Sequence, residues 1–265
     1  MKTHHSSFER NKMKLTVFDI ETAGIRDIAL ELAEPFKNFE PLPPFDPKAV
    51  KVGNIKDPDK VAAKIRAEEE AYPNKVKEHE AEYERKKDEY EAKIVSNAAL
   101  NAITGRIVAI GIKQYDKEFI LSGDEISVLK AFWDLFATSN DFFVGWNSND
   151  FDVPFLVQRS WKLGVIVPNI FNGRYLDKRF IDLMEMFACG KYGYRLSLDK
   201  ASKYFGIQGK FDGDCTGETF AQMWESDDPI AHQTAEQYLK CDLHATWGIA
   251  EKMLPCVPKI DADFC

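Results

Sequence analysis

The chain has 265 residues, 45% of them hydrophobic, which is enough to bury a full core and to form one or two domains. A formal net charge of −8 excludes a broad basic coat for nucleic acid, and no stretch approaches the roughly 18 continuous apolar residues of a membrane span. The N-terminus lacks the apolar segment of a signal peptide, and five cysteines without a Cys-x-x-Cys pair argue against a disulfide framework. We therefore expect a cytoplasmic protein that is neither secreted nor bound to a membrane.

The first predicted element is a buried strand over residues 13–20, rich in apolar and β-branched side chains. Asp19 and Glu21 stand two positions apart at its end, so they point to the same face. Two carboxylates this close are costly to desolvate unless a cation lies between them or one is protonated. Oxygen ligands of this kind suit Mg²⁺ or Mn²⁺. Taken alone, the motif fits a loop acid at a strand end equally well.

Residues 26–96 form an insertion before the next predicted strand. Its part from 34 to 58 is rich in proline and phenylalanine and is expected to be irregular. A helix is predicted to begin at Pro58, to break or kink at Pro73, and to be followed by a second, charged helix to about Val95. A narrow apolar stripe on the second helix can pack on the first, pair with another copy or clamp nucleic acid, and packing is favoured. The stripe consists of Tyr72, Val76, Tyr83, Tyr90 and Ile94.

Strands are next predicted near 106–114 and 117–121, then a helix near 124–137, and then a strand over 141–146 that leads into a helix over 151–163. This alternation favours an α/β sheet whose functional site lies at strand ends. Asp152 stands where the last strand meets its helix, so it fits a metal ligand or an acid that serves the helix dipole. Asp150 is an alternative ligand, but we expect it to cap the helix.

The last predicted helix spans 229–253 and begins after Asp227 and Asp228, with Pro229 as its first residue. Tyr238 and Asp242 are four residues apart on this helix, so the phenol and the carboxylate share one face. Such a pair is common by chance. It gains meaning from the two acidic motifs that precede it.

In this order, the three motifs resemble those of the DEDD superfamily of 3′-to-5′ exonucleases. The first reads Asp-Ile-Glu-Thr after a hydrophobic strand, the second has Asn147 followed by Phe151 and Asp152, and the third is a tyrosine four residues before an aspartate. The third motif is that of the tyrosine subclass, because the histidine subclass needs a histidine where this chain has Gln237. Residues 145–156, 197–199 and 205–207 are most similar to the exonuclease domains of family B DNA polymerases and their free-standing relatives.

The resemblance implies an α/β ribonuclease H-like fold, a mixed central sheet flanked by helices, in a single exonuclease domain over 13–254 with tails at 1–12 and 255–265. It implies two Mg²⁺ or Mn²⁺ ions about 4 Å apart, one activating a water and the other stabilising the leaving 3′ oxygen. The implied ligands of these ions are Asp19, Glu21, Asp152 and Asp242. Tyr238 would orient the water, because a phenol with a pKa of about 10 is a poor base at neutral pH. Asp182 would be a supporting residue behind the ligands, or else a helix cap.

Lys and Arg outnumber Asp and Glu between residues 153 and 210, so this segment can line the path of a nucleic-acid strand or form a solvated face. Asn147 and Phe151 flank the acids and can contact the last nucleotides. The candidates for nucleic-acid contacts are therefore Asn147, Phe151, Arg174, Arg179, Lys191 and Arg195.

The leading hypothesis is a metal-dependent exonuclease that releases nucleoside 5′-monophosphates from the 3′ end of single-stranded or frayed DNA, in proofreading or repair. A 3′-to-5′ RNA exonuclease is the alternative that the same acids support. The alternative outside the enzymes is a non-catalytic module that binds nucleic acid or a polymerase. The absence of one of the metal-ligating carboxylates would favour it. Because the length leaves no room for a polymerase domain, we expect either a free-standing enzyme or a separate subunit, whose candidate partner is a separate DNA polymerase or replication protein.

Overall fold

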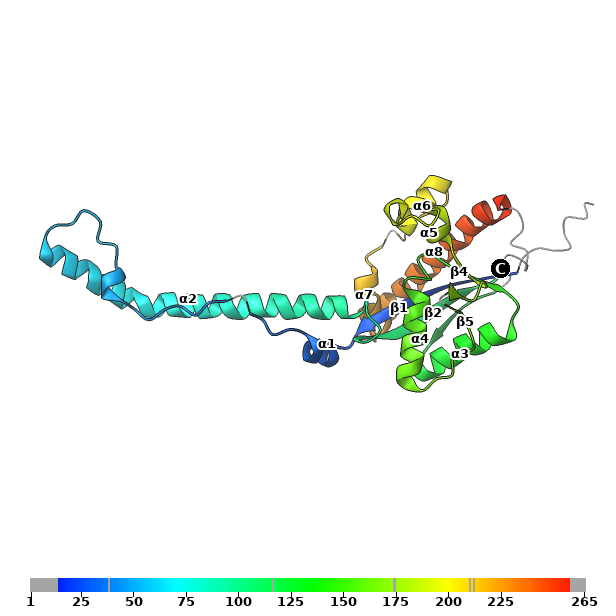
Figure 1. Ribbon diagram of the computed structural model, residues 1–265, viewed down its shortest axis with the longest axis horizontal. Helices are drawn as coiled ribbons and strands as arrows, with labels where there is room; N and C mark the ends of the chain where they lie inside the picture. The colour runs from blue at the N-terminus through cyan, green and yellow to red at the C-terminus, as the bar shows by residue number, and fades with distance from the viewer. Residues whose placement is uncertain are drawn as a thin grey trace, which may run out of the picture. The chain divides into compact units, whose positions relative to one another are not determined.

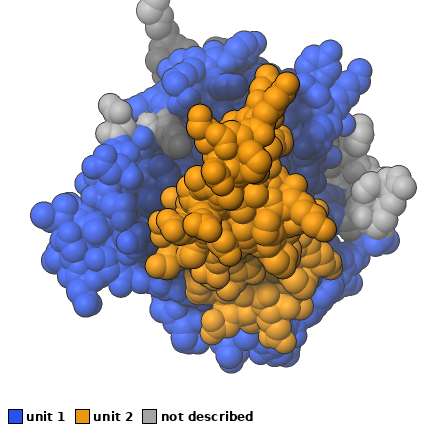
Figure 2. All heavy atoms as spheres, turned by 90° about the vertical axis from the view of Figure 1, so that its left-hand side faces the viewer, with its two compact units in different colours: residues 1–25, 98–265 blue, residues 26–97 orange. Residues whose placement is uncertain are grey.

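The computed structural model describes residues 14–37, 39–115, 117–173, 175–209, 211 and 213–257, without the side chain of Tyr175. The predicted tail at 1–12 and the tail from 258 onward lie outside these residues. Contacts within the chain define two units, which Figure 2 colours separately. One consists of residues 1–25 and 98–265 and is the α/β unit; the other, residues 26–97, is the insertion unit.

The α/β unit is built on a five-stranded mixed sheet in the order β3-β2-β1-β4-β7 (Figure 1). Strand β1 pairs antiparallel with β2 and parallel with β4. At the edges, β3 runs antiparallel to β2 and β7 runs parallel to β4. The strands are β1 (Leu15–Gly24), β2 (Gly105–Lys113), β3 (Glu118–Ser122), β4 (Phe142–Gly145) and β7 (Phe180–Asp182), with a separate hairpin of β5 (Phe171–Asn172) and β6 (Tyr175–Leu176). The predicted mixed sheet with a helical insertion between its first two strands is confirmed.

Helices cover both faces of this sheet (Figure 1). On one face, α3 (Glu125–Thr138) and α4 (Asp152–Leu163) share a core with β1 and β2. On the other face lies α8 (Pro229–Met253), packed with three shorter helices and followed by the turn η4 (Leu254–Cys256). The shorter helices are α5 (Leu183–Phe187), α6 (Leu198–Phe205) and α7 (Gly217–Trp224).

The alternation of side chains along β1 sets the direction of its two acids. Phe18 and Ile20 are buried in the core formed with α3 and α4, whereas Val17 is buried in the core that contains α8. Successive strand residues point to opposite faces, so Asp19 shares the face of Val17. Glu21 follows on that face, just before a bulge between Glu21 and Thr22. Both acids therefore face α8.

A glycine lets α8 approach the sheet closely. Gly111 on β2 is the partner of Asp19 in the β1–β2 register. A Cβ atom at Gly111 would lie 2.8 Å from Cδ1 of Leu243 and 2.9 Å from Cγ of Leu239. Carbon atoms in favourable contact stand about 3.5–4.0 Å apart, so no larger residue fits here unless these leucine side chains or α8 itself move. The close approach brings Asp242, the neighbour of Leu243, over β1.

The insertion unit consists of α1 (Arg26–Leu32), an extended segment containing the turn η2 (Pro47–Ala49), and nearly all of α2 (Pro58–Ala98). Of the break or kink predicted at Pro73, the break is wrong, because α2 continues through the proline. The hydroxyl of Tyr72 donates to the carbonyl of Pro43, and the ring of Tyr72 lies 5.5 Å from that of Phe45. Such contacts beside the proline offset the roughly 3 kcal/mol that an internal proline costs a helix.

The apolar stripe of α2 packs on the proline- and phenylalanine-rich segment, and not on another helix as favoured from sequence. Phe36 lies 5.5 Å from Tyr90 and 5.8 Å from Tyr83, measured between ring centroids. The rings of Phe39 and His79 pack at a tilt with their centroids 4.3 Å apart, and the hydroxyl of Tyr90 donates to the carbonyl of Glu34 at 2.7 Å. The rest of α2 is highly charged, and none of the helices in the described part of the chain is long and apolar enough to cross a membrane.

Candidate active site

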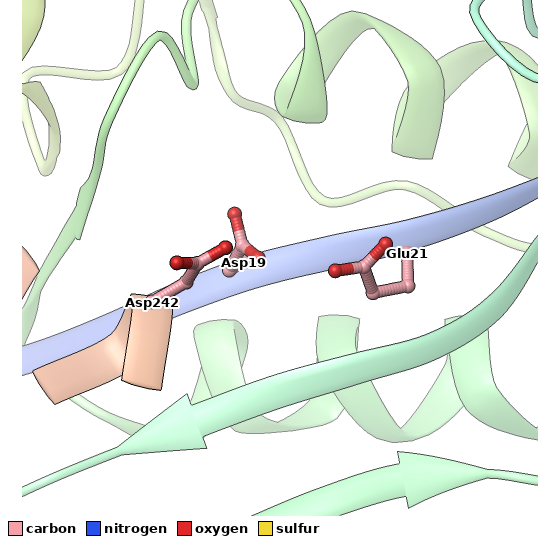
Figure 3. A group of neighbouring side chains, drawn as sticks. All are labelled: Asp19, Glu21 and Asp242. Atoms are coloured by element: carbon pink, nitrogen blue, oxygen red, sulfur yellow. The ribbon is translucent and has the colours of Figure 1, made fainter. Parts of the chain in front are cut away.

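Three carboxylates meet between β1 and α8. One oxygen from each of Asp19, Glu21 and Asp242 lies within 4.8 Å of the others. Figure 3 shows Asp242 reaching from α8 toward Asp19, with the carboxylate of Glu21 turned toward both. Glu21 is only 6% exposed and the other two are half-buried. The tertiary structure thus brings together the acids of the first and third sequence motifs.

Asp152 adjoins this group without being one of the three. It is the first residue of α4 and is 3% exposed. Its Oδ1 accepts the backbone N–H of Ile20 at 3.0 Å, and Ile20 stands between Asp19 and Glu21 on β1. This hydrogen bond fixes the start of α4 against the strand that carries the two acids.

Burial and repulsion between negative charges raise the pKa values of Asp19, Glu21 and Asp152. Burial raises the pKa of Asp19 well above its ordinary value, and the negative charges of Asp152, Glu21 and Asp242 raise it further. Burial likewise raises the pKa of Glu21, with Asp242 and Asp152 adding to the effect. The pKa of Asp152 is raised to about 7 by burial, although the N–H of Ile20 works in the opposite direction. A crowded set of oxygen donors that cannot all ionise alone fits a site for Mg²⁺ or Mn²⁺.

Tyr238 lies one turn before Asp242 on α8 and is 8% exposed. Its ring packs near those of Phe220, at 6.1 Å, and Phe211, at 6.4 Å. Burial raises the pKa of Tyr238 above its usual range, and the charges of Asp242, Glu21 and Asp19 raise it further. The side chain therefore stays a neutral phenol, able to donate a hydrogen bond. Phe211 and Phe220 were missed from sequence; Phe220 could have been found from the amphipathic run that follows Thr216.

Asp182 accepts four backbone hydrogen bonds at the end of β7. The N–H groups of Met184 and Glu185 donate to it at 2.9 and 3.1 Å, so it caps α5. Asn147 and Asn149 donate at 3.1 and 3.0 Å, which ties down the turn that leads to Asp152. Asn147 needs such support because its φ of 65° is left-handed. Asp182 is thus a helix cap that also holds this turn, and its charge contributes to the raised pKa of Asp152.

The expectation that Asp150 caps α4 is wrong. Phe151 occupies the N-cap position, and no side chain makes a capping hydrogen bond there. Asp150 instead forms an ion pair with Arg195, which the chain brings back to this turn from beyond α5. Phe151 packs 5.6 Å from Phe155 at the edge of the core.

The remaining candidates for nucleic-acid contacts are dispersed. Arg174 lies outside the described residues. Arg179 donates to the carbonyls of Phe136 and Ser139 at 3.0 and 3.1 Å, and its guanidinium carbon is 3.7 Å from the ring centroid of Phe136. Because this guanidinium is satisfied within the protein, we leave Arg179 out of the proposed strand path. Lys191 is exposed, and Arg195 lines a pocket together with Asn147.

A family model and two curated relatives match this chain. Residues 89–261 match a family described as "Predicted 3'-5' exonuclease related to the exonuclease domain of PolB". An uncharacterized protein of Methanocaldococcus jannaschii is 28% identical over 172 residues, which cover 61% of this chain and 93% of that protein. DNA polymerase 2 of Aeropyrum pernix is 29% identical over 168 residues, which cover 56% of this chain but only 20% of the polymerase.

A solved structure shares the fold. The family B DNA polymerase from the hyperthermophilic archaeon Pyrobaculum calidifontis superposes with a TM-score of 0.52 and 20% sequence identity. The match covers 92% of this chain and 25% of the polymerase chain. Since the family match spans more than half of the sequence, the chain belongs to the family of predicted 3′-5′ exonucleases related to the exonuclease domain of PolB.

Proposed function

We propose that this protein is a two-metal-ion 3′-to-5′ exonuclease of the tyrosine subclass of the DEDD superfamily. The observation that carries the proposal is the meeting of Asp19, Glu21 and Asp242 within 4.8 Å, with Asp152 adjoining them. Family membership supports a nuclease, and the buried carboxylates support a hydrolysis that depends on divalent ions.

Asp19, Glu21, Asp152 and Asp242 would hold two Mg²⁺ or Mn²⁺ ions. When bound, such ions supply an activated water and stabilise the leaving oxygen of a phosphodiester. The protein itself provides the fixed placement of the carboxylates, through the Ile20 hydrogen bond and the packing of α8 at Gly111. Tyr238 would orient the attacking water as a hydrogen-bond donor, since its raised pKa keeps the phenol protonated.

The proposed substrate is the 3′ end of single-stranded or frayed DNA, with nucleoside 5′-monophosphates as products. DNA is favoured because the curated relative with a named activity is a DNA polymerase. An unpaired end is favoured because the scissile phosphate must reach carboxylates as buried as Glu21. A DNA polymerase or replication protein is the proposed partner, which the similarity to a DNA polymerase supports. In the described part of the chain, the cysteines at positions 189, 215, 241 and 256 form no disulfide bond, which supports a reducing, cytoplasmic setting.

The test is digestion of a 5′-labelled single-stranded DNA and its RNA counterpart in Mg²⁺, Mn²⁺ or EDTA. We expect a DNA ladder that shortens from the 3′ end, needs the metal and disappears in Asp19→Ala. Asp134→Asn is the matched control, because Asp134 is an exposed aspartate on α3, away from the carboxylate group. Shortening of RNA alone would replace the DNA proposal with the RNA exonuclease. No shortening of either strand would refute the enzyme and leave a binding module.

A further inference from the structure

A pocket of about 460 Å³ opens where β4 and β7 end. Its walls include Trp146, Asn147, Tyr192 and Arg195. Its volume falls within the roughly 300–1,000 Å³ of small-molecule sites in proteins. The mechanism described above assigns no role to Trp146, Tyr192 or the pocket itself.

Tyr192 presents an open aromatic surface at this pocket. It begins the short turn η3 (Tyr192–Tyr194) and is 82% exposed. The guanidinium carbon of Arg195 lies 5.0 Å from the centroid of its ring, and Arg195 is held in turn by its ion pair with Asp150. Elsewhere in the lining, the indole N–H of Trp146 donates to the carbonyl of Leu196 at 3.1 Å. The pocket therefore has ordered walls and a tyrosine ring available for stacking.

The charges around the pocket disfavour a phosphate as its occupant. Among the described lining residues Arg195 is the one cation, and Asp150 already pairs with it. The negative charges of Asp150, Asp182 and Glu185 all act on Arg195, with Asp150 the strongest through its hydrogen bond. A phosphate inside the pocket would meet these acids without an uncommitted cation among the described lining residues. A neutral flat group that stacks on Tyr192 fits better.

The position of the pocket relates it to the substrate strand. Strand β4 runs parallel to β1, with Val144 beside Val17, so Asn147 leaves β4 at the end of the sheet where Asp19 and Glu21 stand. Five residues later the same turn reaches Asp152. A strand whose 3′ end lies among the carboxylates and which leaves them toward Asn147 would bring one of its earlier nucleotides to the pocket.

We propose that the pocket formed by Trp146, Asn147, Tyr192 and Arg195 binds one unpaired nucleobase of the substrate strand, stacked on Tyr192, upstream of the nucleotide being removed. This inference rests on the proposed exonuclease function. It adds a site that holds the strand by a base and not by a phosphate. Stacking on an aromatic side chain is tolerant of base identity, so DNA of any sequence would be held.

The first test measures the binding of a dye-labelled single-stranded DNA 12-mer by anisotropy, in EDTA to prevent cleavage. We expect Tyr192→Ala to weaken binding about tenfold, with an unchanged dependence on salt, because the lost contact involves no phosphate. Tyr192→Phe should bind like the wild type, since the ring remains. Tyr115→Ala is the matched control, because Tyr115 is 78% exposed and lies in the β2–β3 turn at the opposite end of the sheet.

The second test finds the base that occupies the pocket. Single abasic residues are placed at successive positions from the 3′ end, and each strand is bound to the wild type and to Tyr192→Ala. At one position the abasic residue should weaken wild-type binding about tenfold while adding nothing in Tyr192→Ala. Equal binding by Tyr192→Ala and wild type would overturn the proposal. The proposal would also be overturned if, at every position, the loss of affinity caused by the abasic residue simply added to the loss caused by Tyr192→Ala.

A small phosphodiester separates this proposal from the proposed function. A chromogenic ester of thymidine 5′-monophosphate is too short to reach beyond the carboxylates, so Tyr192→Ala should cleave it at the wild-type rate. If the wild type cleaves neither this ester nor DNA with added metal, the exonuclease itself is refuted and the pocket proposal falls with it. If the wild type cleaves DNA but Tyr192 contributes nothing to binding, only the pocket proposal is refuted. An RNA 12-mer run in parallel shows whether the pocket accepts bases of either strand type.

Discussion

Replacement of Asp182 is expected to destabilise the protein strongly, although this residue is not among the proposed metal ligands. Its carboxylate is 5% exposed and divides four N–H groups unequally between its oxygens. Oδ1 accepts from Asn147, Met184 and Glu185, whereas Oδ2 accepts only from Asn149. The side chain thereby joins the turn before α4 to the start of α5.

Because the four hydrogen bonds are divided unequally between the two oxygens, two substitutions of Asp182 should reduce the stability of the protein by different amounts. Asp182→Asn keeps an oxygen for three donors but sets its NH₂ against the N–H of Asn149, so it should lower the free energy of unfolding by about 1.5–3 kcal/mol. Asp182→Ala removes all four acceptor contacts and should lower the free energy of unfolding by about 3–5 kcal/mol. This loss is smaller than the sum for four independent hydrogen bonds, because water enters the vacated space and accepts from the N–H groups. Removing the charge should also lower the pKa of Asp152, which Asp182 helps to raise.

Urea unfolding followed by tryptophan fluorescence measures these losses as shifts of the midpoint at an unchanged m-value. Asp124→Asn is the matched control: Asp124 is an exposed helix cap that accepts from Ser127 at 3.0 Å, and asparagine caps a helix equally well. Its midpoint should not move. If Asp182→Ala unfolded at the same urea concentration as the wild type, the four hydrogen bonds would be replaceable by water and the reasoning would be refuted.

Three further predictions concern the carboxylate site. Gly111→Ala would place a Cβ atom 2.8 Å from Cδ1 of Leu243, so it should lower the free energy of unfolding by about 1–3 kcal/mol, measured by urea unfolding, and should also slow DNA cleavage, measured by digestion. A wild-type result in both assays would contradict the close packing of α8. In the metal-free protein the pKa of Asp152, about 7 against an ordinary 3.8, means that the native state keeps a proton which the unfolded chain releases. The stability that this proton contributes is therefore fully present below about pH 4 and is lost, by about 4 kcal/mol, as the pH rises from about 4 to 7; Mn²⁺ should flatten this slope in urea titrations at several pH values, and an equally steep slope in Asp152→Asn would sink the assignment. Tyr238→Phe should lower kcat about 100-fold while Mn²⁺ still raises Tm as in the wild type, and an unchanged kcat would remove the water-orienting role.

The sequence by itself determined the local geometry of the acids. Strand alternation put Asp19 and Glu21 on one face, and helix periodicity put Tyr238 and Asp242 one turn apart, because both periods follow from backbone geometry alone. Strong start signals also predicted α8 at the bounds observed, Pro229–Met253. Patterns of this kind can be recognised from the sequence because each depends only on residues a few positions apart.

Only the tertiary structure decided which distant groups meet. Asp242 reaches Asp19 because α8 packs directly on Gly111, a contact that no local pattern encodes. Arg179, which looks like a free loop cation in the sequence, donates hydrogen bonds to carbonyls at the end of α3. Asp150 pairs with Arg195, which follows α5 in the chain. The continuation of α2 through Pro73 likewise depends on an extended segment that folds back along it. Burial and hydrogen bonding between remote segments, which set these outcomes, appear in the sequence only as residue types and not as partners.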